Sequence, residues 1–575
     1  MTGSPPERSG IAPVYRDDPR LQPLIGPGAP FEIEHIVLDG VPLRTFVRAP
    51  RTILDAFEMG AAHEALVHLV HDEERWTFAD VRSRSLSVAR ELHASFGVRP
   101  GDRVAIAMRN LPEFIVSFWG AALTGAIVVP LNSWWTGPEL NYALRDAGAV
   151  VAFLDDERLE RVIADGRPPG VQLVSVRAQG VDGADASFDE LLHGAPLESS
   201  AIAQLGPDDP VTILYTSGTT GRPKGALGTN RAAIANVWNM AFVAGRESLI
   251  AGRQPGPSRQ TATLAAQPLF HIGGVASIIG SPIGGTKLVL MRKWDVEEAM
   301  HLAVRERVTG FGGVPAIARQ VVEYPGREHL DLDIRTFPMG GAAVPPDLPL
   351  RALQAFGDTV QLLNGYGLTE TTSAVVTNVG IECAARPDSV GRPNLTADLR
   401  VVGPDGEVLD VGEVGELCFR SPQVVKGYWK DDAATRAAFD DGWFHSGDVG
   451  YVDDDGFVHV VDRIKDVVIR GGENVYCVEV EAVLHHHPDV VEVAVVGLPE
   501  PVMGERVCAV VVSRPGAGVT LAQLRAFAAE RLAGFKCPEA LALTDELPKT
   551  ATGKVAKNVV RDQLADAAAA VERMW

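Results

Sequence analysis

The sequence predicts an α/β protein: a large N-terminal α/β region with several subdomains and a β-rich lobe, followed by a small C-terminal α+β domain. From about residue 50, apolar segments of strand length alternate with amphipathic helical patterns, which is typical of layered folds with largely parallel sheets. Near residue 400 the pattern changes to short apolar segments separated by turn sequences. After Lys465 a compact α/β pattern follows, and 575 residues suffice for about three or four units of ordinary domain size.

The N-terminal region opens with Pro- and Gly-rich residues 1–30, which we expect to form a flexible tail. Farther along, Ser or Thr followed three positions later by Glu predicts helix starts. Thr136 with Glu139, and Ser187 with Glu190, are such capping pairs before apolar helical runs. The predicted strands of this region are residues 103–107, 150–154, 173–176, 211–215 and 288–291.

Turn sequences, a helix-capping pair and apolar segments likewise predict the elements of the β-rich lobe and the C-terminal domain. Turn sequences at residues 403–406 and 453–456 separate short strands. Thr520 with Gln523 predicts a helix start, and the following apolar residues share one helix face: Leu521, Leu524, Phe527, Ala528 and Leu532. The predicted strands are residues 416–420, 457–461, 492–496 and 507–512. We place a tail at 1–30, an N-terminal domain at 31–461, a hinge at 462–466 and a C-terminal domain at 467–575.

Composition and charge exclude several function classes. A formal charge of −21 argues against a nucleic-acid-binding face, because phosphate binding depends on Lys and Arg. Five cysteines without a CxxC pair argue against a disulfide scaffold or zinc ribbon, and no signal peptide is recognisable, so we expect a cytoplasmic protein. The uncharged run of residues 114–131 barely reaches bilayer-spanning length, and its Gly and Pro residues favour a buried helix leading into a buried strand. Stable membrane insertion is therefore not expected.

Scarce lysines and one glycine-rich run point to phosphate chemistry. Only 10 lysines accompany 43 arginines, and the first is Lys224, which stands in the run TSGTTGRPKG at residues 216–225. Glycines there allow the backbone N–H groups to form a concave surface, and four hydroxyls and one ammonium group surround it, which suits a polyphosphate. The run is not a Walker A loop, because Pro223 stands where that motif needs glycine.

This run resembles the phosphate-binding signature of the adenylate-forming superfamily, which includes acyl- and aryl-CoA synthetases, peptide-synthetase adenylation domains and luciferase-like enzymes. The likeness extends from about residue 50 to 565, and within the superfamily it is greatest to the acyl-CoA synthetase and fatty-acid–CoA ligase family. Six further segments resemble its motifs in the usual order: PLFHIGG (268–274), GGAAVP (340–345), NGYGLTE (364–370), WFHSGDVG (443–450), DRIKDVVIRGGENVY (462–476) and PKTATGK (548–554).

The resemblance implies ATP and CoA as co-substrates, Mg²⁺ as cofactor, and formation of an acyl-adenylate followed by attack of the CoA thiol. It implies that Asn364 and Tyr366 hold adenine, by hydrogen bonding and stacking, and that Asp448 and Arg463 contact the ribose. Glu370 with Thr216 would hold Mg²⁺, which prefers oxygen ligands. The implied ATP/AMP-binding set also contains Ser217, Gly218, Thr219, Thr220, Gly221, Lys224, Gly340, Gly341, Ala342, Gly365, Gly367 and Thr369.

Five more residues receive roles from the resemblance. Lys554 would bridge the carboxylate and the α-phosphate, and His271 would stand at the mouth of the acyl pocket. Lys465 would be the hinge about which the small C-terminal domain moves between the half-reactions, and Gly471 and Gly472 would line the thiol channel, since glycine permits close backbone approach. From the residues alone, simpler readings remain open: a solvated loop lysine for Lys554 and a packed or helix-capping histidine for His271.

The sequence also departs from the family pattern. Asn230 stands where a histidine often follows the phosphate loop, and Gly273, Gly274 and Val275 stand where some long-chain enzymes place a bulky gate. The triplet at residues 485–487 suggests a metal site, but consecutive residues on a helix cannot converge on one ion, which favours a solvated helix end.

The leading hypothesis is an ATP- and Mg²⁺-dependent carboxylate–CoA ligase for an apolar acid, either medium- or long-chain or ring-bearing. By analogy, its pocket is expected near residues 269–275, 312–317, 340–343 and 366–374, where Gly and Ala are abundant. Two alternatives stay open: an acyl-AMP ligase that loads a carrier-protein thiol, and a non-catalytic acyl-nucleotide sensor. The acyl group, the pathway and the oligomeric state, including a homodimer, are left undecided.

Overall fold

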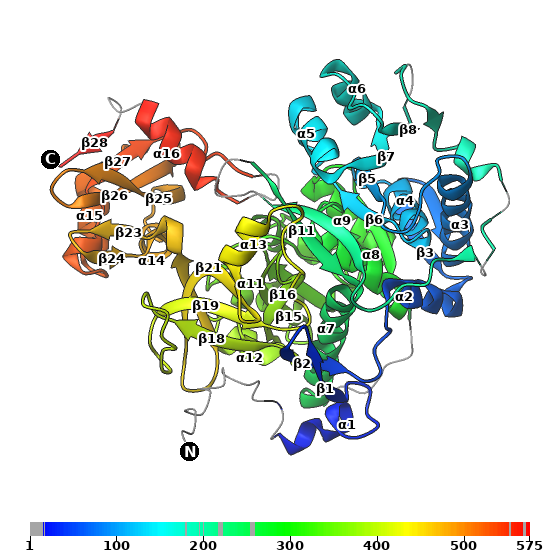
Figure 1. Cartoon of the computed structure of the whole chain (residues 1–575). Coiled ribbons are helices and arrows are strands. Elements are labelled where there is room, and N and C mark those ends of the chain that lie inside the picture. Colours follow the sequence, from blue (N-terminus) through cyan, green and yellow to red (C-terminus); the bar gives the residue numbers. More distant parts are fainter. Residues whose placement is uncertain are drawn as a thin grey trace, which may run out of the picture. The chain divides into compact units, whose positions relative to one another are not determined.

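The protein is described by a computed structural model, which covers residue 15 and residues 18–178, 181–194, 196–198, 201–216, 222–252, 259–550, 554–566 and 571–574. The chain divides into two compact units (Figure 1). The larger unit lies within residues 9–399 and 419–444, and the smaller unit within residues 400–418 and 445–575. The domain boundaries drawn from the sequence stay predictions.

The larger unit contains a seven-stranded sheet in the order β11-β10-β6-β5-β7-β8-β9. Its strands are β5 (Arg103–Ala107), β6 (Ile127–Pro130), β7 (Ala149–Asp155), β8 (Gln172–Val176), β9 (Ala186–Ser187), β10 (Pro210–Thr216) and β11 (Lys224–Thr229). Every neighbouring pair is parallel except β10 with β11. Helix α3 (Phe78–Ala94) precedes β5, and the helices between these strands include α4 (Pro112–Leu123), α5 (Gly137–Ala147) and α6 (Asp156–Ala164). The alternation expected from the sequence is therefore confirmed.

Two four-stranded sheets continue the larger unit, in the orders β12-β13-β3-β4 and β14-β15-β16-β17. Their strands are β3 (Val67–His71), β4 (Glu74–Thr77), β12 (Ala262–Ala265), β13 (Lys287–Leu290), β14 (Thr336–Gly340), β15 (Gln361–Leu368), β16 (Ser373–Val379) and β17 (Arg392–Pro393). The accompanying helices are α2 (Ile53–Met59), α7 (Asn230–Ile250), α8 (Ile272–Gly284), α9 (Val296–Arg305), α10 (Pro315–Val322), α11 (Leu348–Phe356) and α12 (Gly380–Ala385). An N-terminal hairpin pairs β1 (Ile33–Leu38) with β2 (Val41–Phe46).

The β-rich region is a five-stranded sheet in the order β18-β19-β21-β20, with β22 paired to β21. Its strands are β18 (Asp398–Val402), β19 (Gly415–Arg420), β20 (Phe439–Asp440), β21 (Trp443–Val452) and β22 (Val458–Arg463), and α13 spans Asp432–Ala438. A six-stranded sheet follows, in the order β24-β23-β26-β27-β28 with β25 on β26. Its elements are β23 (Val468–Arg470), β24 (Glu473–Val475), β25 (Val490–Glu500), β26 (Gly504–Ser513), β27 (Ala540–Leu543), β28 (Glu572–Arg573), α14 (Cys477–Leu484), α15 (Leu521–Ala529) and α16 (Lys557–Asp566).

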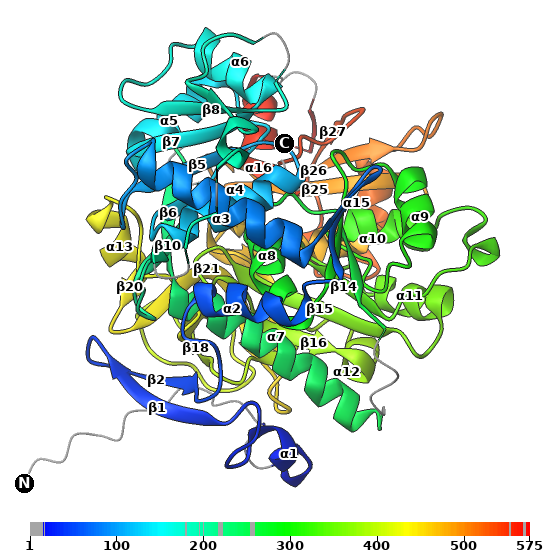
Figure 2. The same ribbon diagram turned by 90° about the vertical axis from the view of Figure 1, so that its right-hand side faces the viewer.

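The core of the seven-stranded sheet lies around helix α4. All twelve residues of α4 are buried, and α3 lies alongside it (Figures 1 and 2). The run 114–131 is thus a buried helix followed by strand β6, as the sequence predicts. Among the helices in the described residues, none combines the length and apolar character that a membrane crossing needs.

Capping explains where several helices begin. Thr136 and Glu139 form the expected capping box: the Thr136 backbone N–H donates to Glu139 Oε2 at 2.8 Å, and α5 follows directly. Ser187 and Glu190 exchange the same bonds, as the predicted helix start requires, but the helix that follows is only the short 3₁₀ helix η4 (Glu190–Leu192). Helix α15 begins after Thr520 as predicted but ends at Ala529, so Leu532 lies beyond it.

The predicted flexible tail also differs from the structure. Within residues 18–30 the chain forms the 3₁₀ helix η2 (Pro19–Leu21) and α1 (Gln22–Ile25). Leu21 is buried in an apolar cluster with Phe31 and Phe242, and this burial holds a segment whose composition suggested mobility. The tail prediction is therefore wrong for this stretch.

Candidate functional site

The phosphate loop joins two antiparallel strands. Thr216 ends β10 and pairs with Lys224, which begins β11, and Thr216 Oγ1 donates a hydrogen bond to the Lys224 carbonyl at 3.5 Å. Both side chains are half-buried. The loop is thus a strand–loop–strand connection, unlike the strand–loop–helix of a P-loop. The remaining predicted loop residues lie outside the described part of the chain: Ser217, Gly218, Thr219, Thr220 and Gly221.

Tyr428 connects Lys224 to the predicted magnesium ligand. Its hydroxyl donates to Glu370 Oε1 at 2.8 Å, and its ring centroid lies 5.4 Å from Lys224 Nζ. Burial and the neighbouring Glu370 carboxylate raise the pKa of Tyr428, so the phenol stays a donor. Sequence reasoning missed Tyr428, because nothing in the local pattern distinguishes it from a packed aromatic residue.

The turn that carries Thr369 and Glu370 is held under strain. Thr372 and Ser373 adopt positive φ angles of 49° and 79°, which cost non-glycine residues of order 1–3 kcal/mol each. A buried hydrogen bond offsets this cost: Thr372 Oγ1 donates to the Gln423 carbonyl at 2.6 Å.

The Gln423 side chain is fully buried, and both polar atoms of its amide form hydrogen bonds. Its Oε1 accepts from Asn239 Nδ2 at 2.8 Å and from Asn394 Nδ2 at 3.2 Å, and its Nε2 donates to the Ala374 carbonyl at 3.0 Å. With both atoms of its amide bonded, Gln423 joins three segments in one geometry. These bonds therefore fix the turn next to Glu370, and no local sequence pattern predicts them.

Strand β15 carries the predicted adenine residues. Asn364 and Tyr366 are two residues apart, which places them on the same strand face. Asn364 is buried and its Nδ2 lies 3.4 Å from the Ser389 carbonyl, while the half-buried Tyr366 ring centroid lies 6.0 Å from that of Phe419. The adenine contacts of both residues remain predictions.

The glycines of this region have steric reasons to be glycine. Gly340 pairs with Gly365 across β14 and β15, and a Cβ atom on Gly340 would lie 2.6 Å from the Gly365 carbonyl oxygen. A Cβ atom on Gly367 would lie 1.9 Å from the Ser373 carbonyl oxygen. Gly341 has a φ of +77°, and Ala342 after it is exposed. Close strand packing thus accounts for these glycines whether or not they contact a nucleotide.

Three predicted residues come together in the smaller unit. Asp448 on β21 pairs with Arg463 on β22, and Arg463 Nε lies 2.8 Å from the buried Asp448 Oδ1. Lys554 lies close enough to Asp448 and Arg463 for their charges to change its pKa. Loss of solvation and, to a smaller degree, the Arg463 charge lower the pKa of Lys554, while Asp448 opposes this shift. A carboxylate, a guanidinium and an ammonium group with a perturbed pKa are thus grouped, as in many functional sites.

The predicted hinge and channel residues lie farther along the smaller unit. Lys465 is exposed in the 3₁₀ helix η7 (Ile464–Asp466). Gly471 and Gly472 form the two-residue turn of the β23–β24 hairpin, with φ angles of +59° and +88°. These values are typical of a type I′ turn, which requires positive φ at both positions.

His271 caps a helix in the larger unit. It is the N-cap of α8, and its Nδ1 accepts a hydrogen bond from the Gly273 N–H at 3.4 Å. The capping reading therefore has a structural basis, and the role at the acyl pocket stays a prediction. Beside this helix a small cavity of about 10 Å³, roughly one water in size, is lined by residues that include Ile272, Val275 and Thr372 from the predicted pocket segments.

The histidine triplet lies at a helix end, as the sequence predicts, and two of its three side chains are exposed, while His487 is half-buried against Phe527. Helix α14 ends at Leu484, and His485 and His486 after it are exposed. Among the described residues, the side chains grouped closely enough to share a metal ion are instead Glu416, Cys418 and His445.

The donors proposed for Mg²⁺ suit that ion. Glu370 Oε1 is engaged by Tyr428, which orients the carboxylate and leaves Oε2 as a second oxygen. Thr216 contributes a half-buried hydroxyl beside the phosphate loop. Carboxylate and hydroxyl oxygens are hard ligands, and Mg²⁺ is typically bound by one or two protein oxygens with water and substrate phosphates.

Comparisons with known proteins extend over most of the chain. The model of the AMP-binding enzyme family matches residues 56–429, and that of the AMP-binding enzyme C-terminal domain matches residues 479–554. A feruloyl-CoA synthase from Amycolatopsis sp is 38% identical over 496 residues, covering 85% of this chain and 94% of that protein. The long-chain-fatty-acid–CoA ligase FadD13 from Mycobacterium tuberculosis is 35% identical over 496 residues, covering 85% and 93%. The solved structure of o-succinylbenzoate CoA synthetase from Bacillus subtilis with its acyl-adenylate matches with a TM-score of 0.75 and 30% identity, over 90% of this chain and 98% of that one.

Proposed function

Because the chain belongs to the AMP-binding enzyme family, we propose that it is an ATP-dependent acid–thiol ligase that joins an apolar carboxylic acid to CoA. What carries the proposal is the grouping of Asp448, Arg463 and Lys554, since three charges of these types can bind a nucleotide and neutralise a reacting phosphate. The names of the relatives, which are CoA synthases and ligases for aromatic and long-chain acids, support the same class.

In the first half-reaction the substrate carboxylate attacks the α-phosphate of ATP and pyrophosphate leaves. Asp448 accepts the ribose hydroxyls and Arg463 adds a second contact, while Asn364 and Tyr366 hold adenine. Lys554 places its ammonium group between the carboxylate and the α-phosphate, where it offsets developing negative charge. Lys224 and the loop that ends at Thr216 hold the leaving phosphates. Mg²⁺, held by Glu370 and Thr216, would supply further neutralisation of the phosphate charge.

In the second half-reaction the CoA thiol attacks the acyl carbonyl and AMP leaves. Lys465 acts as the hinge for a movement that withdraws Lys554 from the acyl-adenylate and brings the Gly471–Gly472 turn to it. His271 stands at the mouth of the acyl pocket. The acid is ring-bearing or long-chain, and its pocket lies near residues 269–275, 312–317, 340–343 and 366–374. We also propose that the enzyme works in the cytoplasm.

Pyrophosphate release tests the proposal. The protein is incubated with ATP, Mg²⁺ and a panel of fatty and aromatic acids, with and without CoA, and products are identified by mass spectrometry. We expect CoA-stimulated release with an acyl-CoA product that is absent from Lys554→Ala. Pyrophosphate release without an acyl-CoA product would indicate that a carrier-protein thiol, and not CoA, accepts the acyl group. No pyrophosphate release across the panel would favour an acyl-nucleotide sensor.

A further inference from the structure

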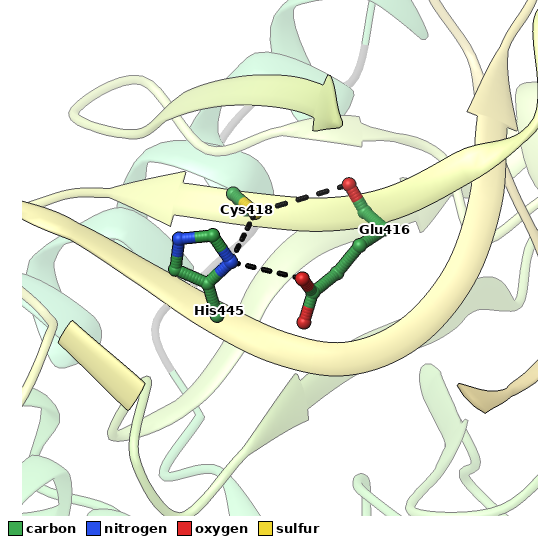
Figure 3. A group of neighbouring side chains, drawn as sticks. All are labelled: Glu416, Cys418 and His445. Carbon is green, nitrogen blue, oxygen red and sulfur yellow. Dashed lines mark hydrogen bonds and ion pairs between the residues drawn. The ribbon is translucent and has the colours of Figure 1, made fainter. Parts of the chain in front are cut away.

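Three polar side chains meet on two strands of the smaller unit just before Asp448 (Figure 3). Glu416 and Cys418 are two residues apart on β19, so their side chains share one strand face. His445 on β21 lies against both: its Nδ1 is 2.9 Å from Glu416 Oε2 and 3.3 Å from Cys418 Sγ. None of these three residues is among the site residues predicted from the motifs.

The Glu416 carboxylate holds both sides of the bend that leads to Asp448. Its Oε2 contacts His445, and its Oε1 accepts a hydrogen bond from the Gly447 N–H at 2.9 Å. Between them, Ser446 Oγ accepts from the Asp448 N–H at 3.0 Å. Gly447 has a φ of +69° and nothing within 4 Å of a Cβ position, so its own surroundings restrain the bend little. Glu416 therefore restrains the bend together with Ser446 and with the pairing of Asp448 and Arg463.

We propose that Glu416, through His445 and Gly447, is a positioning residue that aims the Asp448 carboxylate at the ribose hydroxyls of the nucleotide. The inference rests on the proposed function, because it takes Asp448 as the ribose contact. Asp448 is only 3% exposed and its Oδ1 is paired with Arg463, so a small rotation of the bend would misdirect its hydrogen bonds.

A transition-metal site is the competing use of the same atoms. One nitrogen, one sulfur and one oxygen within 4.8 Å of one another suit such an ion. However, both carboxylate oxygens of Glu416 already have partners: Oε1 accepts the Gly447 N–H and Oε2 contacts His445 Nδ1. The Arg400 guanidinium also forms a hydrogen bond with Cys418. A cation beside the sulfur opposes a second cation, and a metal ion would replace the Glu416–His445 contact. The two uses therefore exclude each other and can be separated by experiment.

The test compares ATP with 2′-deoxy-ATP and 3′-deoxy-ATP in acid-dependent pyrophosphate release by the full chain. The readout is the ratio of kcat/KM for ATP to that for each deoxy analogue, which reports the ribose contacts and not general stability. We expect Glu416→Ala to reduce this ratio about tenfold, because hydrogen bonds to a charged group are lost. Glu416→Gln keeps an acceptor for the Gly447 N–H and should lose less. Glu413→Gln is the matched control: Glu413 is exposed on the same segment, accepts the Asp410 N–H at 2.8 Å, and should leave the ratio unchanged.

Two further arms keep failures distinguishable. Asp448→Asn must reduce the ratio; if it does not, the ribose role in the proposed function is wrong. If Asp448→Asn reduces the ratio but Glu416→Ala leaves it at the wild-type value, the positioning inference alone is overturned. Dialysis against a chelator and the Cys418→Ala change should both preserve the ratio. If chelation lowers the ratio and added Zn²⁺ restores it, a metal ion holds the bend and the proposal is overturned.

Discussion

The change of Gly472 to Trp separates the two half-reactions. Gly472 is the second turn residue of the β23–β24 hairpin at a φ of +88°, where any L-residue costs about 1–2 kcal/mol. Nothing lies within 4 Å of its Cβ position, so a Cβ atom there meets no neighbour inside the unit. Gly472→Ala carries the same backbone cost without the bulk and is the matched control. Both variants should therefore lower the melting temperature equally, by roughly 2–8 °C for a unit of this size.

The half-reactions should then respond differently. In Gly472→Trp we expect acyl-CoA formation from presupplied acyl-AMP to fall about a hundredfold, because the ring occupies the thiol path, while pyrophosphate release stays near wild type. Gly472→Ala should retain both steps. Stopped-flow measurement of each half-reaction, with calorimetry on all three proteins, supplies the comparison. Undiminished acyl-CoA formation in the Trp variant would refute the placement of the thiol path, and equal loss of both steps would show that the unit had unfolded.

Three further predictions concern the site. Lys554→Ala should lower adenylation by about 10²–10³-fold and leave thioester formation from acyl-AMP intact; equal loss of both steps would contradict that division of labour. The pKa of Lys554 is lowered in part by Arg463 and adenylation needs the protonated amine, so the alkaline limb of the pH–rate profile should move to higher pH in Arg463→Gln and to lower pH in Asp448→Asn; shifts of the opposite sign would refute the grouping. Tyr428→Phe should raise the Mg²⁺ concentration needed for half-maximal adenylation roughly tenfold, because Glu370 loses the donor that orients it; an unchanged Mg²⁺ titration would remove Tyr428 from the site.

Each strand predicted from a local sequence pattern overlaps a strand of the structure, and two of the three predicted helix starts begin α-helices. The apolar segment at 103–107 is strand β5, and the Thr136–Glu139 pair begins helix α5, because strand alternation and helix capping depend on a few consecutive residues. The antiparallel pairing of β10 with β11 was not predicted, because Gly225 and Gly228 weaken the strand pattern that follows the loop. The short 3₁₀ helix after Ser187 shows the same limit: a cap can begin a helix but does not decide its length.

The site shows a similar division. Residues inside motifs, such as Asp448, Arg463 and Lys554, could be nominated from the sequence, and the structure groups them in the smaller unit. Residues that act through contacts between distant segments could not. Tyr428 and Glu370 are 58 positions apart in the chain, and only the folded arrangement brings the phenol to the carboxylate. The buried Gln423 network and the Glu416 carboxylate were missed for the same reason.

All five cysteines of the protein are buried. Burial raises the pKa of Cys383, Cys418 and Cys508 to about 12, so these thiols are both covered and protonated at neutral pH. In a native reaction mixture the thiol of CoA is therefore the one that a colourimetric disulfide reagent should detect, and its disappearance can be followed without background from the enzyme. Without CoA, the same reagent reports unfolding, because each unfolded molecule exposes five cysteine thiols that react with it.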